Sequence, residues 1–130
     1  MGDYYQRIGA AAMAVADTPV RQLLLYSEVQ AGVVSADLFW QAPQESLVHF
    51  RFAPAELRDL LYEFWERGAG EIAPRSWAAI RFTIDGTGRF AANLTYPDQF
   101  KADEGLPDRR PRVIAELFPG AKVDYSRPRG

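Results

Sequence analysis

The side chains that could carry out chemistry are few and scattered in this chain of 130 residues. His49 is the only histidine, and the sequence contains no cysteine. A Ser-His-Asp triad would need His49 as its base, but no serine lies at a sharp strand-to-helix turn. One histidine also supplies too few nitrogen or sulfur ligands for a zinc site. We therefore expect no catalytic residue, no metal site and no cofactor, and we expect that the protein is not an enzyme.

Two further patterns resemble catalytic or ligand-binding motifs. The segment Asp85-Gly86-Thr87-Gly88 has the glycine content of a phosphate-binding loop, but it lacks the lysine of such loops and opens no helix. Its composition is typical of a tight turn between two strands. The 17 acidic residues give many chance carboxylate pairs, and none can be assigned to a pocket for acid–base work.

Four acidic residues form a regular row in the segment from Pro54 to Arg67. In a helix, their spacings of three, four and three residues place them on one side, opposite a stripe of leucines. Like charges at these spacings destabilise an isolated helix, so stability alone would favour lysines among them. The row is either a solvated helix face or a negative patch for a basic partner. We call it the acidic row, and it consists of Glu56, Asp59, Glu63 and Glu66.

The composition is that of an ordinary globular domain. Hydrophobic residues make up 48% and charged residues 25%, and the net charge is −2. No segment approaches the roughly 20 apolar residues that span a bilayer, and no basic leader precedes the apolar N-terminal segment. We expect a cytoplasmic protein without a membrane or nucleic-acid partner, folded as one domain over 1–130 with frayed ends at 1–3 and 125–130.

The hydrophobic pattern predicts three helices and five strands. Helices are expected over 3–16, 54–67 and 108–118, each ending at a proline or glycine signal. Strands are expected over 21–30, 33–41, 47–52, 77–84 and 89–96, where apolar residues alternate with polar ones. Short turns, including Ala31-Gly32, would join the neighbouring strands, which favours antiparallel pairing.

These elements predict an α+β fold of order α-β-β-β-α-β-β-α. The helices would cover one face of a sheet of about five strands and leave the other face in solvent. Phe50 and Phe52 would point into the core. Glu28 and Asp37 would lie on the outer face, which makes them a second candidate contact surface beside the acidic row. Phe39 and Trp40 point in opposite directions, so one of them would be exposed.

The order of several short motifs resembles that of the YezG-like immunity proteins, the antidotes of bacterial polymorphic toxin systems. The resemblance covers roughly residues 4–120. It rests on Tyr26-Ser27-Glu28-Val29, Phe39-Trp40, Leu61-Tyr62-Glu63-Phe64-Trp65-Glu66, Trp77, Asp85-Gly86-Thr87-Gly88-Arg89-Phe90, Tyr96 and Arg109-Arg110. It implies a cytosolic antitoxin that binds a toxin domain and masks its active site. Toxins of such systems are often nucleases, whose basic clefts would suit an acidic antidote.

Two functional readings remain open beside an enzyme, which would need titratable groups clustered near His49 or among the carboxylates. The leading one is an immunity protein that binds a cognate toxin through the acidic row. The alternative is a small-ligand-binding or regulatory module with a cleft between helix and sheet. The sequence does not determine the oligomeric state or the chemistry of the toxin.

Overall fold

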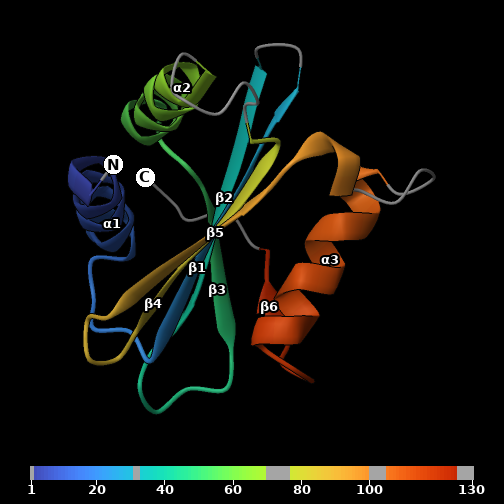
Figure 1. Cartoon of the computed structure of the whole chain (residues 1–130). Coiled ribbons are helices and arrows are strands. Elements are labelled where there is room, and N and C mark those ends of the chain that lie inside the picture. The colour runs from blue at the N-terminus through green and yellow to red at the C-terminus, as the bar shows by residue number, and fades with distance from the viewer. Residues whose placement is uncertain (1, 31–32, 70–76, 100–104, 126–130) are drawn as a thin grey trace.

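The computed structural model describes residues 2–30, 33–69, 77–99 and 105–125, which form three α-helices and one sheet (Figure 1). The helices are α1 (Gly2–Ala16), α2 (Ala55–Ala69) and α3 (Leu106–Leu117), and a short 3-10 helix, η1, covers Pro97–Gln99. The strands are β1 (Gln22–Gln30), β2 (Val33–Gln41), β3 (Val48–Phe52), β4 (Ala79–Asp85), β5 (Phe90–Thr95) and β6 (Val123–Asp124). The α+β class and the predicted order of elements are confirmed.

The sheet has the strand order β5-β4-β1-β2-β3-β6. Neighbouring strands pair antiparallel, as the short turns predicted, except that β6 lies parallel to β3. β1 is central, and its Leu25 lies opposite Leu38 of β2 on one side and Phe82 of β4 on the other. The sheet therefore has one strand more than the sequence predicted. The two-residue strand β6 has too few residues to show any periodicity.

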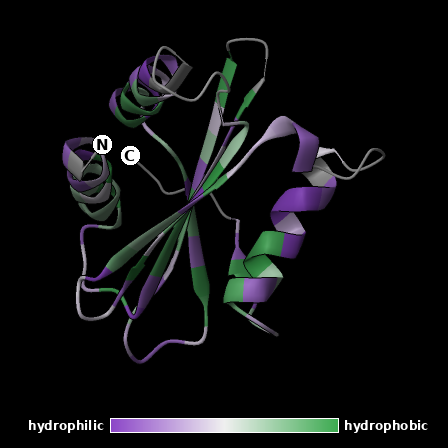
Figure 2. Ribbon diagram, in the orientation of Figure 1, coloured by the Kyte–Doolittle hydropathy of each residue, from purple (hydrophilic) through white to green (hydrophobic). Residues whose placement is uncertain are grey.

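Helices α1 and α2 pack side by side on one face of the sheet (Figure 1). Ile8 and Ala12 of α1 and Leu57, Leu61 and Phe64 of α2 are fully or almost fully buried there. They meet the strand residues whose side chains alternate toward that face, such as Leu23, Leu25, Leu38 and Phe82. This core is apolar, and the helices turn their hydrophilic sides to solvent (Figure 2).

Helix α3 covers the opposite face of the sheet, so the prediction of helices on one face only was wrong (Figure 1). A second core forms where Val113, Ile114 and Phe118 of α3 pack on Leu24 and Phe39. The physical reason is that β1 and β2 are apolar on both faces. Leaving the second face in water would expose Leu24, Tyr26 and Phe39, whose burial is favourable.

The two-sided covering changes the position of several aromatic residues. Phe39 and Trp40 are both buried, on opposite faces, whereas the sequence predicted that one would be exposed. Phe52, predicted to point into the core, is 66% exposed. It is the last residue of β3, and its register partner is the polar Asp37 instead of an apolar residue. Only Phe50 of this pair packs against the second core.

The end of helix α1 follows a local sequence signal. Asp17 has a φ of 52°, and its amide donates to the Met13 carbonyl at 2.9 Å, which closes the last turn of α1 before Pro19. Helix α1 includes Gly2 and Asp3, which lie in the segment 1–3 that was predicted to fray. The predicted Ala31-Gly32 turn and residues 126–130 lie outside the described part of the chain.

Candidate functional site

The acidic row lies on the solvent side of α2, as its spacing predicted. Leu57, Leu61 and Phe64 turn the other side of the helix into the core. Glu56, Asp59 and Glu66 are exposed, and Glu63 is half-buried. The helix thus presents a line of carboxylates, held in position by the packing of its apolar side.

Glu63 differs from the other members of the acidic row because it also joins α2 to α1. The Tyr4 hydroxyl donates a hydrogen bond of 2.9 Å to Glu63 Oε1. Partial burial and this bond raise the pKa of Tyr4 above its usual value. Arg67 Nε lies 3.9 Å from the same oxygen, but both side chains are largely solvated, so this ion pair contributes little.

The remaining carboxylates of the acidic row are not paired with any cation of the described residues. Within the described residues, Glu56, Asp59 and Glu66 form no ion pair. Tyr62 lies one helical turn from both Asp59 and Glu66, is partly exposed, and packs its ring 5.7 Å from that of Trp65. A negative surface therefore lies next to an aromatic side chain of the kind that is enriched in protein interfaces.

Glu28 and Asp37 do not form the second contact surface that the sequence predicted. Their side chains are on the face opposite α1 and α2, as expected, but α3 covers that face. Glu28 is 2% exposed and Asp37 is 4% exposed. Both carboxylates are used inside the molecule, where arginines at the start of α3 bind them.

Glu28 is the centre of a buried hydrogen-bonded group that also contains Arg109 and Tyr26. Arg109 donates from Nη2 to Glu28 Oε1 at 2.6 Å and from Nε to Oε2 at 2.7 Å, a bidentate pair. The Tyr26 hydroxyl donates to Oε2 at 2.6 Å. Burial and this carboxylate hold the pKa of Tyr26 well above its usual range. The hydrogen bonds to Glu28 raise the pKa of Arg109, which stays protonated.

A second arginine of α3 binds the other buried carboxylate. Arg110 Nη1 donates to Asp37 Oδ2 at 2.7 Å, and the Arg110 side chain is about one-third exposed. The consecutive residues Arg109 and Arg110 therefore connect α3 to β1 and to β2, respectively. The sequence signal for this role was that Glu28 and Asp37 are each the sole charged residue of a strand rich in apolar residues, because a buried carboxylate requires a cation.

His49 contacts an aromatic ring and one carboxylate among the described residues. Its ring stacks on Trp40 at 5.7 Å, and Nε2 lies 2.7 Å from Oε2 of Glu45, at the exposed turn between β2 and β3. Among the described residues no group of three or more histidine, cysteine, aspartate or glutamate side chains could hold a metal ion. The predicted turn at Asp85-Gly86-Thr87-Gly88 is present. Asp85 Oδ1 accepts hydrogen bonds from the Thr87 hydroxyl and from the Thr87 and Arg89 amides, and these bonds, the hydroxyl bond first, lower the pKa of Asp85.

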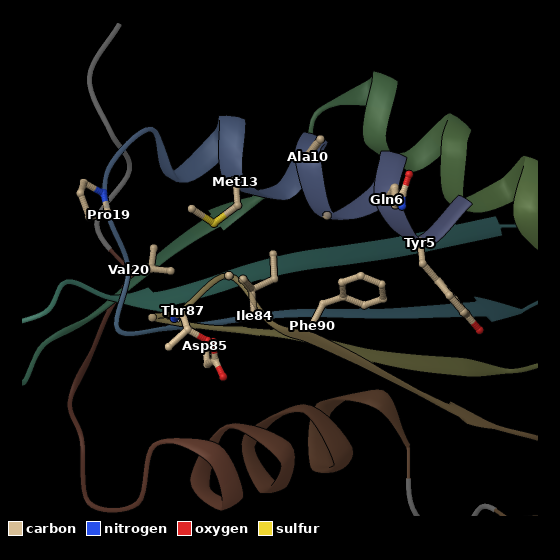
Figure 3. Close-up of a pocket in the computed structure, with 13 residues that line it drawn as sticks. Tyr5, Gln6, Ala10, Met13, Pro19, Val20, Ile84, Asp85, Thr87 and Phe90 are labelled. Atoms are coloured by element: carbon tan, nitrogen blue, oxygen red, sulfur yellow. Dashed lines mark hydrogen bonds between the residues drawn. The ribbon is translucent and has the colours of Figure 1, made fainter. Parts of the chain in front are cut away.

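A groove of about 520 Å³ lies between α1 and the turn that joins β4 to β5 (Figure 3). Tyr5, Met13 and Phe90 line it, and Gly9 brings the helix close, since a Cβ there would lie 3.4 Å from the Phe82 ring. The Phe90 ring stacks on Phe82 at 5.3 Å. The volume of the groove is within the range of small-molecule sites, and the walls of the groove are largely apolar.

Comparison with known proteins adds no family to this description. The chain matches no protein-family model and no curated protein. The resemblance to immunity proteins therefore remains a prediction. In the described part of the chain, each helix is too short or too polar to cross a bilayer.

Proposed function

We propose that this chain is an immunity protein that binds a toxin domain with a basic cleft and masks its active site. The observation that carries the proposal is the exposed acidic row, whose Glu56, Asp59 and Glu66 form no ion pair with the described residues. An uncompensated negative surface speeds the approach of a basic partner. The resemblance in motif order to YezG-like antidotes supports the same function.

Tyr62 supports a protein partner over a purely solvated face. Tyrosine buries a large ring at low cost in conformational entropy and is enriched where proteins bind each other. Its position beside Asp59 and Glu66 would let one helix face supply both charge attraction and apolar contact. A nuclease toxin, whose cleft is built to hold phosphates, would present the matching positive charge.

The decisive experiment co-expresses this chain with the toxin domain encoded by a neighbouring gene. We expect the toxin alone to stop growth and this chain to restore it. In vitro, Asp59→Lys and Glu66→Lys should each slow association by about tenfold at low salt, with a smaller effect at high salt. The matched control is Glu45→Lys, which makes the same charge change on the exposed β2–β3 turn, at the other end of the molecule from α2 (Figure 1).

Two results would count against the proposal. If co-expression fails to restore growth, the chain is not the antidote of that toxin. If growth is restored but Asp59→Lys and Glu45→Lys bind equally fast, the acidic row is only a solvated face and another surface binds the toxin.

The groove between α1 and the β4–β5 turn favours a second candidate, a small-ligand-binding module. A ligand that binds only the native state raises the melting temperature. A thermal-shift screen of small aromatic compounds therefore separates the two functions, provided that Phe90→Ala abolishes any shift that is found.

A further inference from the structure

The two outer edges of the sheet are built differently. At one edge, β6 has only two residues, one of them Asp124, and Lys122 lies just before it. Short, charged edges resist pairing with another strand. At the other edge, β5 has six residues, Phe90–Thr95, with the sequence FAANLT. It contains no charge, proline or glycine, so its own side chains provide none of the devices that usually protect an edge.

The backbone groups of β5 divide into two sets. The Arg89 carbonyl accepts from the Asp85 amide at 2.9 Å, and the Thr95 carbonyl accepts from the Ala78 amide at 2.7 Å. In an antiparallel pair the two backbone groups of one residue point the same way and alternate along the strand. The amides and carbonyls of the odd-numbered residues of β5 therefore point toward β4. Phe90, Ala92 and Leu94 direct their amides and carbonyls outward, where no described strand pairs with them.

We propose that this edge binds the β5 edge of a second copy of the chain, with the two strands antiparallel. A twofold axis perpendicular to the sheet at Ala92 places Ala92 opposite itself and Phe90 opposite Leu94 of the second copy. Each outward amide then meets an outward carbonyl, so all three residues are satisfied in both copies. The two six-stranded sheets become one continuous sheet.

The side chains of β5 fit this register. On the face of α1, the Phe90 ring, 45% exposed in the single chain, packs against Leu94 of the second copy. On the other face, the exposed side chains of Ala91 and Asn93 lie opposite each other across the axis. All of these side chains are neutral, so no like charges meet. The smallest side chain falls on the axis itself, which favours a second copy over a strand of unrelated sequence.

The register is tested with charges at the two exposed positions. In the proposed dimer, Ala91 of one copy is directly opposite Asn93 of the other, at the closer type of antiparallel pair. We expect sedimentation equilibrium of the full chain to show a concentration-dependent dimer. The doubly basic variant A91K/N93K and the doubly acidic variant A91E/N93E should each dimerise at least about tenfold more weakly. An equimolar mixture of the two should form heterodimers.

The same pair can be joined covalently, since the chain has no cysteine of its own. The Cα atoms of such a pair lie within the range that a disulfide bridges. Under mild oxidation, a mixture of A91C and N93C should yield a disulfide-linked heterodimer, and either variant alone should yield much less. A thermal melt of each variant checks that the monomer fold is retained.

Three outcomes overturn the proposal. They are a wild-type chain that stays monomeric at millimolar concentration, a dimer that the like-charged variants leave unchanged, and a dimer whose cysteine pair does not cross-link in the mixture. The result is independent of toxin binding, because the acidic row lies on α2 and not on β5.

Discussion

The two faces of the sheet are held to their helices by different forces. The contact with α1 and α2 is apolar, and residues such as Leu61 and Phe64 make it by burial alone. The contact with α3 adds three arginine–carboxylate pairs, the buried Arg109–Glu28 and the more exposed Arg110–Asp37 and Arg81–Glu116, to a smaller apolar core. Apolar packing tolerates exchange of one hydrophobic side chain for another of similar volume. A buried bidentate ion pair tolerates almost none, because either partner alone is a charge without compensation.

The largest difference between the faces should come from breaking the buried pair. Arg109→Met leaves the Glu28 carboxylate under α3 without its cation, and we expect it to lower the free energy of unfolding by about 3–5 kcal/mol. Urea denaturation followed by circular dichroism measures this loss. The control replaces the whole group, Tyr26→Phe, Glu28→Leu and Arg109→Met together, and should recover most of the stability, since a well-packed apolar group can substitute for a buried pair. A triple variant as unstable as the single one would contradict this account.

The apolar face should respond to volume and not to charge. Leu61 is fully buried under α2, so Leu61→Ala should lower the free energy of unfolding by about 2–4 kcal/mol through lost burial and the cavity. Leu61→Met keeps the volume and should cost less than about 1.5 kcal/mol. The equally conservative Arg109→Lys on the other face should cost more than Leu61→Met, because lysine cannot form the bidentate pair. Equal losses for these two variants in the same urea assay would remove the distinction between the faces.

The smallest expected effect is a difference in pH dependence. The pKa of Tyr26 lies well above its usual value of about 10, because burial and Glu28 favour the protonated phenol. Its contribution to stability is therefore complete below pH 10 and is lost as the pH rises above that value. Tyr26→Phe should cost about 1.5 kcal/mol at pH 7 and should flatten the fall in stability above pH 10. Tyr4 and Tyr5, whose pKa values are also raised, would leave a residual slope. If the unfolding free energies of wild type and Tyr26→Phe fall equally steeply with pH above 10, Tyr26 is not a source of this pH dependence.

The sequence predicted the elements whose signals are local. Apolar spacing in α2, alternation in β2 and glycine turn chemistry at Gly88 each arise within a few residues, and each is confirmed. The position of the acidic row on the solvent side of α2 follows from the same local pattern. No local sequence pattern, in contrast, indicates which element covers the second face of a sheet.

The errors concern contacts between distant residues. The consecutive Leu23, Leu24 and Leu25 place apolar side chains on both faces of β1, and this run was the available signal for a second helical layer. Alternation alone located Glu28 and Asp37 on the far face correctly but said nothing of α3. Their arginines lie 81 and 73 positions away in the chain, beyond the reach of any periodicity.

This separation also orders events during synthesis. The ribosome releases Glu28 long before Arg109, so β1 to β4 can pair while the carboxylate is still hydrated. The Glu28 carboxylate can lose this water only when α3 docks. Before Arg109 is in place, no cation would offset the free-energy cost of desolvating the carboxylate. Docking of α3 is therefore the step that closes the second face of the sheet.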